Sequence, residues 1–179
     1  GNTVVDALLQ ISEQYYDFKQ NNPTLASFIE DHPRYILVTA HRRESFGAPF
    51  EDMCGAMREI AERHKDTAII YPVHPNPNVR NTVKSILSGH PSIFLSEPLD
   101  YLCFVHLMKK SHLILTDSGG VQEEAPTFGK PVLVMRGNTE RPEGVEAGVS
   151  ILVGTSRGKI TETVDRLLTS SQAYADMSL

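Results

Sequence analysis

The sequence predicts an α/β fold in which a parallel sheet is covered by helices on both faces. Six short apolar runs rich in β-branched residues alternate with helical patterns of roughly 10 to 18 residues, and this alternation is typical of βαβ units. Runs such as Leu113–Leu115 are continuously apolar, as expected of strands that are buried on both faces. We therefore expect a Rossmann-like, three-layer domain.

Strands and helices are expected to alternate from residue 35 to the end of the chain. The predicted strands are Tyr35–Thr39, Ala68–Tyr71, Ile93–Leu95, Leu113–Thr116, Pro131–Met135 and Ser150–Val153. Pro49 suits the first turn of a helix through Ala61, because the missing N–H of proline is harmless there. Gly129 is expected to end the helix that begins near Gly120. Side-chain caps are expected for the other helices, at Asn76, Asp100 and Ser156.

The segment before the first strand has an apolar pattern of helical spacing that continues from Val4 to Phe18. This helix precedes the sheet instead of joining two strands. We expect residues 1–24 to form a connecting helix that packs on a domain of residues 25–179. A helix in this place also favours the hypothesis that the chain is one half of a larger protein, with the N-terminal domain absent from this chain.

Composition narrows the class of function. The net charge is −5, from 17 Lys and Arg against 22 Asp and Glu, which argues against a nucleic-acid partner. No apolar run approaches the ~20 residues that a membrane helix needs, so no membrane partner is expected. Cys54 and Cys103 are expected to be buried thiols in a reducing compartment, so we expect a cytoplasmic protein. The sequence has no metal-ligand spacing, and we expect no cofactor.

Ligands of open parallel sheets bind beyond the carboxyl ends of the strands, and the clearest candidate loop there is Ser118-Gly119-Gly120. Its glycines permit a tight turn and close approach of a ligand. Unpaired N–H groups at the start of the following helix attract an anion, and Ser118 adds a hydroxyl donor. A plain capped turn is the alternative. The segment is neither a dinucleotide fingerprint, nor a P-loop, nor a nucleophile elbow.

Other polar side chains follow the same edge. Glu124, one turn into the helix, can accept hydrogen bonds from sugar hydroxyls or be an exposed helical glutamate. The run His41-Arg42-Arg43 can bind a diphosphate or form a solvated charged loop. Arg141 can clamp a second phosphate or form a surface ion pair. His74 stands among three prolines that fix its direction, although a lone histidine is more often structural.

Residues 2–170 resemble the C-terminal domain of non-hydrolysing UDP-N-acetylglucosamine 2-epimerases. Five stretches carry the resemblance in family-like order: Gly1-Asn2-Thr3-Val4-Val5-Asp6-Ala7-Leu8, His41-Arg42-Arg43-Glu44, Tyr71-Pro72-Val73-His74-Pro75-Asn76-Pro77, Leu115-Thr116-Asp117-Ser118-Gly119-Gly120 and Glu140-Arg141-Pro142-Glu143. The resemblance implies the two-domain fold called GT-B, with the substrate between two Rossmann-like halves. This chain would be the nucleotide-binding half.

The resemblance also implies the interconversion of UDP-GlcNAc and UDP-ManNAc, which feeds cell-surface polysaccharides. C2 of the sugar would lose a proton while UDP leaves C1, and the glycal intermediate would take UDP back before C2 is reprotonated on its other face. No loop of this chain offers a convincing pair of carboxylates for that proton transfer. In the family these acids come from the N-terminal domain, so the implied partners are that domain and, at full length, a second subunit in a homodimer.

The resemblance places the UDP ligands of the family on eight positions of this chain: His41, Leu99, Phe104, Ser118, Gly119, Gly120, Glu124 and Arg141. The serine, the two glycines and Arg141 match diphosphate contacts, and Glu124 matches the ribose ligand. Leu99 and Phe104 match uracil contacts, although Leu99 replaces a polar residue, so only a main-chain contact is expected there.

Three positions match residues with special roles in the family, and one of them, His41, is already among these eight. His41 matches a histidine that is tied to both substrate binding and catalysis. Arg42 and His74 match contacts of a second UDP-GlcNAc, which is an allosteric activator of bacterial members. Related alternatives are a hydrolysing epimerase, which releases UDP and free ManNAc, and the donor domain of a GT-B glycosyltransferase. A non-catalytic module that senses nucleotide sugars is the alternative from another class.

Overall fold

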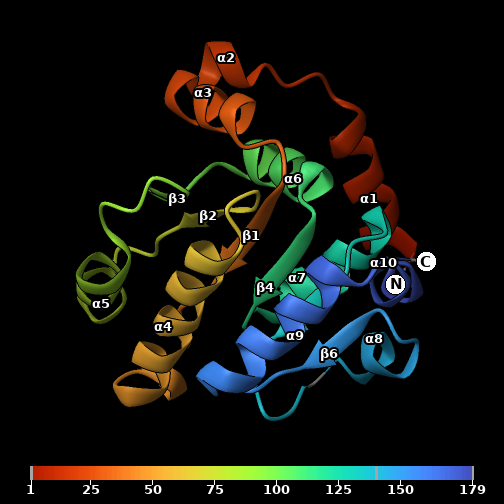
Figure 1. Cartoon of the computed structure of the whole chain (residues 1–179). Coiled ribbons are helices and arrows are strands. Elements are labelled where there is room, and N and C mark those ends of the chain that lie inside the picture. The colour runs from red at the N-terminus through yellow and green to blue at the C-terminus, as the bar shows by residue number, and fades with distance from the viewer. Residues whose placement is uncertain (1, 140, 179) are drawn as a thin grey trace.

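A six-stranded parallel sheet forms the centre of the molecule (Figure 1). The structure is a computed structural model that describes residues 2–139 and 141–178, so Gly1, Glu140 and Leu179, two of which belong to the motifs above, lie outside the described residues. The strands are β1 (Tyr35–Thr39), β2 (Ala68–Pro72), β3 (Ile93–Ser96), β4 (Leu113–Thr116), β5 (Val132–Val134) and β6 (Ser150–Leu152). Each predicted strand is confirmed, with ends that differ by one residue at most.

The strand order β3-β2-β1-β4-β5-β6 records how the chain winds through the sheet. The chain builds outward from β1 to the β3 edge, returns to place β4 against the free side of β1, and then builds outward to β6. Ligands of such sheets bind where the winding direction reverses, beyond the carboxyl ends of the strands. The reversal lies between β1 and β4, whose following loops carry most of the predicted site residues.

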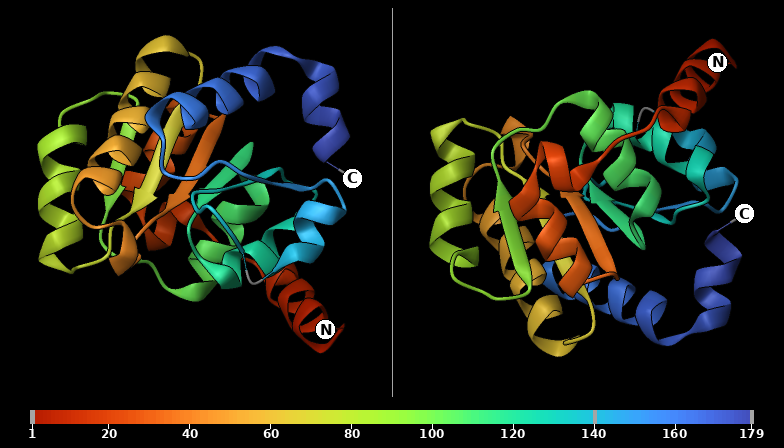
Figure 2. Two further views of the ribbon diagram at one scale, coloured as in Figure 1. Left: turned by 90° about the horizontal axis from the view of Figure 1, so that it is seen from below. Right: turned by 90° about the horizontal axis from the view of Figure 1, so that it is seen from above.

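Helices cover both faces of the sheet, which confirms the predicted Rossmann-like, three-layer architecture (Figure 2). One face packs against α4 (Ala48–Arg63), α5 (Pro77–Leu87), α9 (Arg157–Thr169) and α10 (Ser171–Met177). The other packs against α2 (Phe18–Asn21), α3 (Pro23–Asp31), α6 (Tyr101–Lys110), α7 (Gly119–Glu124) and the 3-10 helix η2 (Ala125–Phe128). Successive β1 residues alternate between the two cores, because side chains of a strand point to opposite faces.

The helix starts follow the predicted caps. The side chains of Asn76, Asp100 and Ser156 accept hydrogen bonds from the first turns of α5, α6 and α9. The expected helix from Gly120 to Gly129 is only partly right. α7 ends at Glu124 and η2 follows, since Pro126 has no N–H to continue the α-helical bonding pattern. Gly129, with φ +68°, therefore ends η2 in the left-handed conformation.

The prediction of one helix from Val4 to Phe18 is wrong. α1 (Asn2–Glu13) stops early, and Phe18 begins α2 instead. The side chains of Asp17 and Asn22 cap α2 and α3, and such side-chain bonds compete with continuous helix. The expected domain boundary at residue 24 falls inside α3, whose Leu25 is fully buried in the core beside α6.

Two further expectations concern the cysteines and the membrane. Cys54 and Cys103 are both buried and free, as predicted, and burial raises the pKa of the Cys54 thiol to about 12. At neutral pH this thiol is therefore protonated and unreactive. Within residues 2–139 and 141–178, every helix is too short or too polar to cross a lipid bilayer.

Candidate functional site

The loops after β1 and β4 lie side by side because these strands are neighbours in the sheet. Thr39 and Thr116 are register partners at the carboxyl ends of the two strands, and their hydroxyls are hydrogen bonded at 2.5 Å. The N–H of Asp117 extends the ladder by donating to the carbonyl of Thr39 at 3.1 Å. The reversal point of the sheet thus brings His41 and Ser118, predicted from separate motifs, to one edge.

A buried carboxylate fastens the two loops together. Asp117 has no exposed side-chain surface, and its Oδ2 accepts the backbone N–H groups of His41 at 2.8 Å and Arg42 at 2.9 Å. Bonds from N–H groups to a charged carboxylate are stronger than neutral hydrogen bonds. Sequence reasoning assigned no role to Asp117. The signal that points to it is a carboxylate placed directly after a strand buried on both faces.

The Ser118-Gly119-Gly120 turn begins α7 as predicted. The N–H of Ser118 donates to Thr116 Oγ1 at 2.9 Å, and Ser118 Oγ accepts the N–H of Val121 at 3.4 Å. The Ser118 hydroxyl therefore keeps its own hydrogen for donation to a ligand. The N–H groups of the two glycines stand in the first turn, where helices offer no internal acceptor.

Arg141 lies over this turn, although it belongs to a distant segment of the chain. A Cβ atom placed on Gly119 would lie 3.6 Å from Nη2 of Arg141. The guanidinium is also paired with Glu123, whose Oε1 lies 2.7 Å from Nε. The Arg141 N–H donates to Thr139 Oγ1, which in turn donates to Gln122 Oε1 on α7. This chain of bonds fixes the loop before α8 (Pro142–Glu146) against α7.

Glu124 points back toward the same turn. A Cβ atom on Gly120 would lie 3.8 Å from Glu124 Oε1, and the other carboxylate oxygen accepts a hydrogen bond from the Tyr101 hydroxyl. Burial, followed by the bond to Glu124, raises the pKa of Tyr101 to about 12, so the hydroxyl stays protonated and remains a donor. Sequence reasoning did not assign Tyr101, because the contact joins α6 to α7.

The two predicted uracil contacts flank the start of α6. Leu99 lies in the loop after β3 and Phe104 in the first turn of the helix, and both are half-buried against the core beneath α6. Tyr101 stands between them in sequence and reaches Glu124. The structure therefore connects the predicted uracil side to the predicted ribose ligand through one hydrogen bond.

His41 and His74 form a stacked pair at the ends of β1 and β2. Their ring centroids are 5.2 Å apart and the rings are tilted by only 4°. The His41 side chain is 46% exposed, so its ring is open to a ligand while Asp117 holds its backbone. Arg42 is half-buried and pairs with Glu44 at 3.2 Å. Arg42 therefore has a local partner that an anion would have to displace or share.

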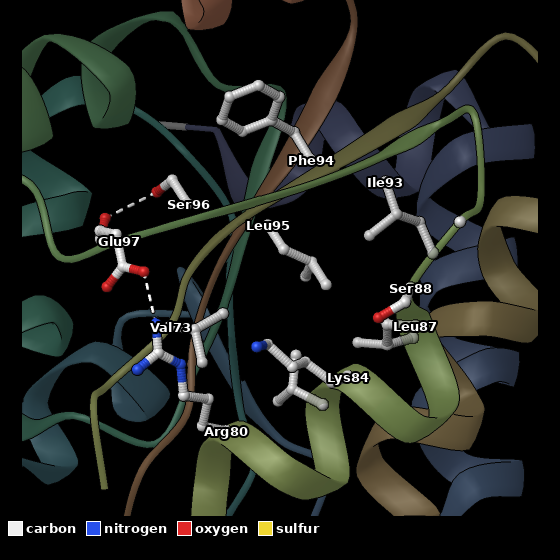
Figure 3. Close-up of a pocket in the computed structure, with 12 residues that line it drawn as sticks. Val73, Arg80, Lys84, Leu87, Ser88, Ile93, Phe94, Leu95, Ser96 and Glu97 are labelled. Carbon is white, nitrogen blue, oxygen red and sulfur yellow. Dashed lines mark hydrogen bonds and ion pairs between the residues drawn. The ribbon is translucent and has the colours of Figure 1, made fainter. Parts of the chain in front are cut away.

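A separate hollow lies on the other side of β2, between α5 and the edge strand β3 (Figure 3). Its volume is about 490 Å³, and the ion pair between Arg80 and Glu97, at 2.5 Å, crosses it on one side. None of the predicted site residues lines this hollow. It is distinct from the edge where the loops after β1 and β4 meet.

Comparisons with known proteins agree on one relationship. A family model described as UDP-N-acetylglucosamine 2-epimerase matches residues 1–179. A UDP-N-acetylglucosamine 2-epimerase from Yersinia pestis is 51% identical over 181 residues, which cover 99% of this chain and 48% of that protein. The chain spans about half the length of the curated relatives it matches.

Solved structures show the same likeness in three dimensions. A crystal structure from Listeria monocytogenes is 46% identical with a TM-score of 0.90, and the match covers 99% of this chain and 46% of that one. The structure of UDP-GlcNAc 2-epimerase from Neisseria meningitidis bound to UDP-GlcNAc is 41% identical with a TM-score of 0.87, covering 99% of this chain and 48% of that one.

Proposed function

Because the chain belongs to the UDP-N-acetylglucosamine 2-epimerase family, we propose that it is the nucleotide-binding half of a non-hydrolysing UDP-GlcNAc 2-epimerase of the two-domain GT-B type. The full-length protein interconverts UDP-GlcNAc and UDP-ManNAc, and a preceding Rossmann-like domain supplies the rest of the cleft. The observation that carries the proposal is the meeting of the Ser118-Gly119-Gly120 turn, Arg141 and the His41 loop at the reversal point of the sheet.

The geometry supports a division of labour along the nucleotide. The Ser118 hydroxyl and the N–H groups of Gly119 and Gly120 donate to the diphosphate, and Arg141 adds a charged donor above them. Glu124, held by the Tyr101 hydroxyl, accepts hydrogen bonds from the ribose. The uracil then lies toward the start of α6, against Leu99 and Phe104.

These donors act on the chemical step as well as on binding. Removal of the C2 proton leaves an electron pair that forms a double bond to C1, while the C1–O bond breaks and its electrons go to UDP. Negative charge grows on the diphosphate, and donors fixed in advance stabilise it. UDP then returns to C1, and C2 is reprotonated on its other face. The carboxylates for proton transfer come from the preceding domain, and His41 faces the reacting sugar.

Arg42 and His74 are proposed to contact a second, activating UDP-GlcNAc. The parallel stacking of His74 on His41 supports this assignment, because a ligand bound at His74 would touch the ring that serves the first substrate. Arg42 is joined to the same cluster through its N–H bond to Asp117. The homodimer, the cytoplasmic location and the role in polysaccharide synthesis remain proposals for the full-length protein.

A UDP titration of the 179-residue chain, compared with the same titration of a serine variant, tests the binding site. We expect the chain to bind UDP weakly, and Ser118→Ala to lower the affinity about 10-fold, because a hydrogen bond to a charged oxygen is lost. Ser170→Ala is the matched control, since Ser170 also caps a helix, α10, whose Tyr174 hydroxyl donates to the carbonyl of His112 at the amino end of β4, away from the proposed site. Isothermal calorimetry that shows no binding up to millimolar UDP, or equal losses in both variants, contradicts the assignment.

Product analysis of the full-length protein tests the reaction. Incubation with UDP-GlcNAc should give a mixture of UDP-GlcNAc and UDP-ManNAc, because UDP returns to the intermediate. The isolated chain should leave UDP-GlcNAc unchanged, since it lacks the proposed acid–base carboxylates. Release of UDP with free ManNAc would identify a hydrolysing enzyme, and binding without turnover at full length would identify a sensing module.

A further inference from the structure

The Asp117 carboxylate is enclosed between the loops after β1 and β4. One of its oxygens, Oδ2, is fully engaged, because it accepts N–H groups from both His41 and Arg42. The other oxygen, Oδ1, is buried and has no hydrogen-bond partner in the described part of the chain. A buried carboxylate oxygen without a hydrogen-bond donor is unfavourable, which indicates a functional reason for its position.

The imidazole of His41 faces this unpaired oxygen. Nδ1 of the ring lies 3.8 Å from Oδ1, which is too far for a hydrogen bond. A small movement of the exposed ring would bring the two atoms within hydrogen-bonding distance. Hydrogen bonds at such sites often tighten only when substrate is bound. An ionised carboxylate accepts but does not donate, so a bond at this place requires a hydrogen on Nδ1.

We propose that Asp117 is a positioning residue that keeps a proton on Nδ1 of His41 and thereby presents Nε2 to the bound nucleotide sugar. A partner on one ring nitrogen decides which nitrogen is left for chemistry. The role of His41 in the reaction rests on the proposed function. The location of its proton follows from the contacts of this chain alone.

Neighbouring groups hold the ring and its backbone in this arrangement. His74 stacks on His41 with parallel rings, which opposes large tilts of the His41 imidazole. The Tyr71 hydroxyl donates to the carbonyl of Ala40 at 2.6 Å, and burial raises the pKa of Tyr71, so this bond persists at neutral pH. The residue before His41 is thus anchored to β2, while Asp117, directly after β4, anchors the backbone of His41 itself.

The variant Asp117→Asn separates this role from a merely structural one. Its amide oxygen can still accept the two backbone N–H groups, so the connection between the loops is retained. Its NH₂ group replaces the oxygen that faces His41 and donates to Nδ1, which forces the ring proton onto Nε2. The readout is the nitrogen-15 NMR spectrum of the imidazoles in the 179-residue chain with saturating UDP, in mildly alkaline buffer. The His41 signals are identified by their loss in His41→Gln.

Asp165→Asn is the matched control for this substitution. Asp165 also faces a histidine, with Oδ1 2.5 Å from Nε2 of His64, but it belongs to α9 and the pair lies where α4 ends. This variant should change the His64 signals and leave those of His41 unaltered. Kinetics of the full-length protein supply the second readout. Asp117→Asn should lower kcat about 100-fold or more and leave KM within about threefold, whereas Asp165→Asn should change neither.

Each possible result either supports or overturns the inference. A proton on Nδ1 of His41 in the wild-type chain that moves to Nε2 in Asp117→Asn, together with the fall in kcat, supports the inference. A wild-type proton on Nε2, an unmoved proton in the variant, or an unchanged kcat overturns it. The wild-type spectrum decides even if the variant does not fold. Failure of the wild-type chain to bind UDP counts against the proposed function, and the spectrum recorded without UDP still decides the location of the proton.

Discussion

Replacing Arg141 with alanine should weaken UDP binding by the 179-residue chain about 10- to 100-fold. The guanidinium lies over Gly119, where it can donate to a diphosphate held by the turn, and a charge-assisted hydrogen bond contributes about 1.5–3 kcal/mol. The substitution also leaves the Glu123 carboxylate, now paired at 2.7 Å, without its cation and free to repel the anion. Isothermal calorimetry at one ionic strength measures the change.

Arg63→Ala is the control for loss of a paired arginine. Arg63 forms ion pairs with Glu59 at 2.9 Å and Asp165 at 2.7 Å, at the end of α4 away from the proposed site. Its removal costs a similar surface interaction but should leave UDP affinity unchanged. If Arg141→Ala binds UDP as tightly as the wild type, Arg141 does not contact the diphosphate. It then only forms a surface ion pair, which is the alternative given by the sequence analysis.

Replacing Phe50 with alanine should lower the free energy of unfolding by about 3–5 kcal/mol. Phe50 lies in the first turns of α4 and is 1% exposed, in the core that joins α4, α5 and α9 to the sheet. Truncation removes a large buried apolar surface and leaves a cavity that a closely packed core refills only in part. Chemical denaturation of the wild type and the variant, analysed with one common m-value, gives the difference in the free energy of unfolding.

Tyr15→Ala provides the matched comparison. Tyr15 is also aromatic but is 85% exposed, so its truncation should change the free energy of unfolding by about 0.5 kcal/mol or less. Equal destabilisation by the two substitutions would contradict the assignment of Phe50 to the core. The same experiment tests whether α4, which follows the His41 loop, is held on the sheet by this face.

The sheet was predictable because its strands leave a local signal. Continuous apolar runs such as that of β4 are read directly from the chain, and Asp100 and Asn76 stand where α6 and α5 begin. The errors come from competition between neighbouring signals. The apolar pattern that reaches Phe18 predicts one helix, but the cap formed by Asp17 begins a new one.

The candidate site was predictable only in parts. The turn at Ser118 and the position of Arg141 each carry a local signal, and each also permits an ordinary structural explanation. The turn meets Arg141 because β5 lies beside β4, and it meets the His41 loop because β1 lies on the other side of β4. Both pairings are long-range properties of the sheet. The contacts of Asp117 with the His41 loop and of Tyr101 with Glu124 join elements far apart in the sequence. A local pattern marks Asp117 as a carboxylate that follows a buried strand, but it does not identify the partner of either residue.

The central claim is that the edge formed by the loops after β1 and β4 holds the diphosphate of a uridine nucleotide. The most direct test is a titration of the nitrogen-15 labelled chain with UDP, followed through its backbone amide signals. The largest changes should occur at Ser118, Gly119, Gly120 and Arg141. Changes centred instead on Ser88, Gly89 and Glu97, in the hollow between α5 and β3, would contradict the account.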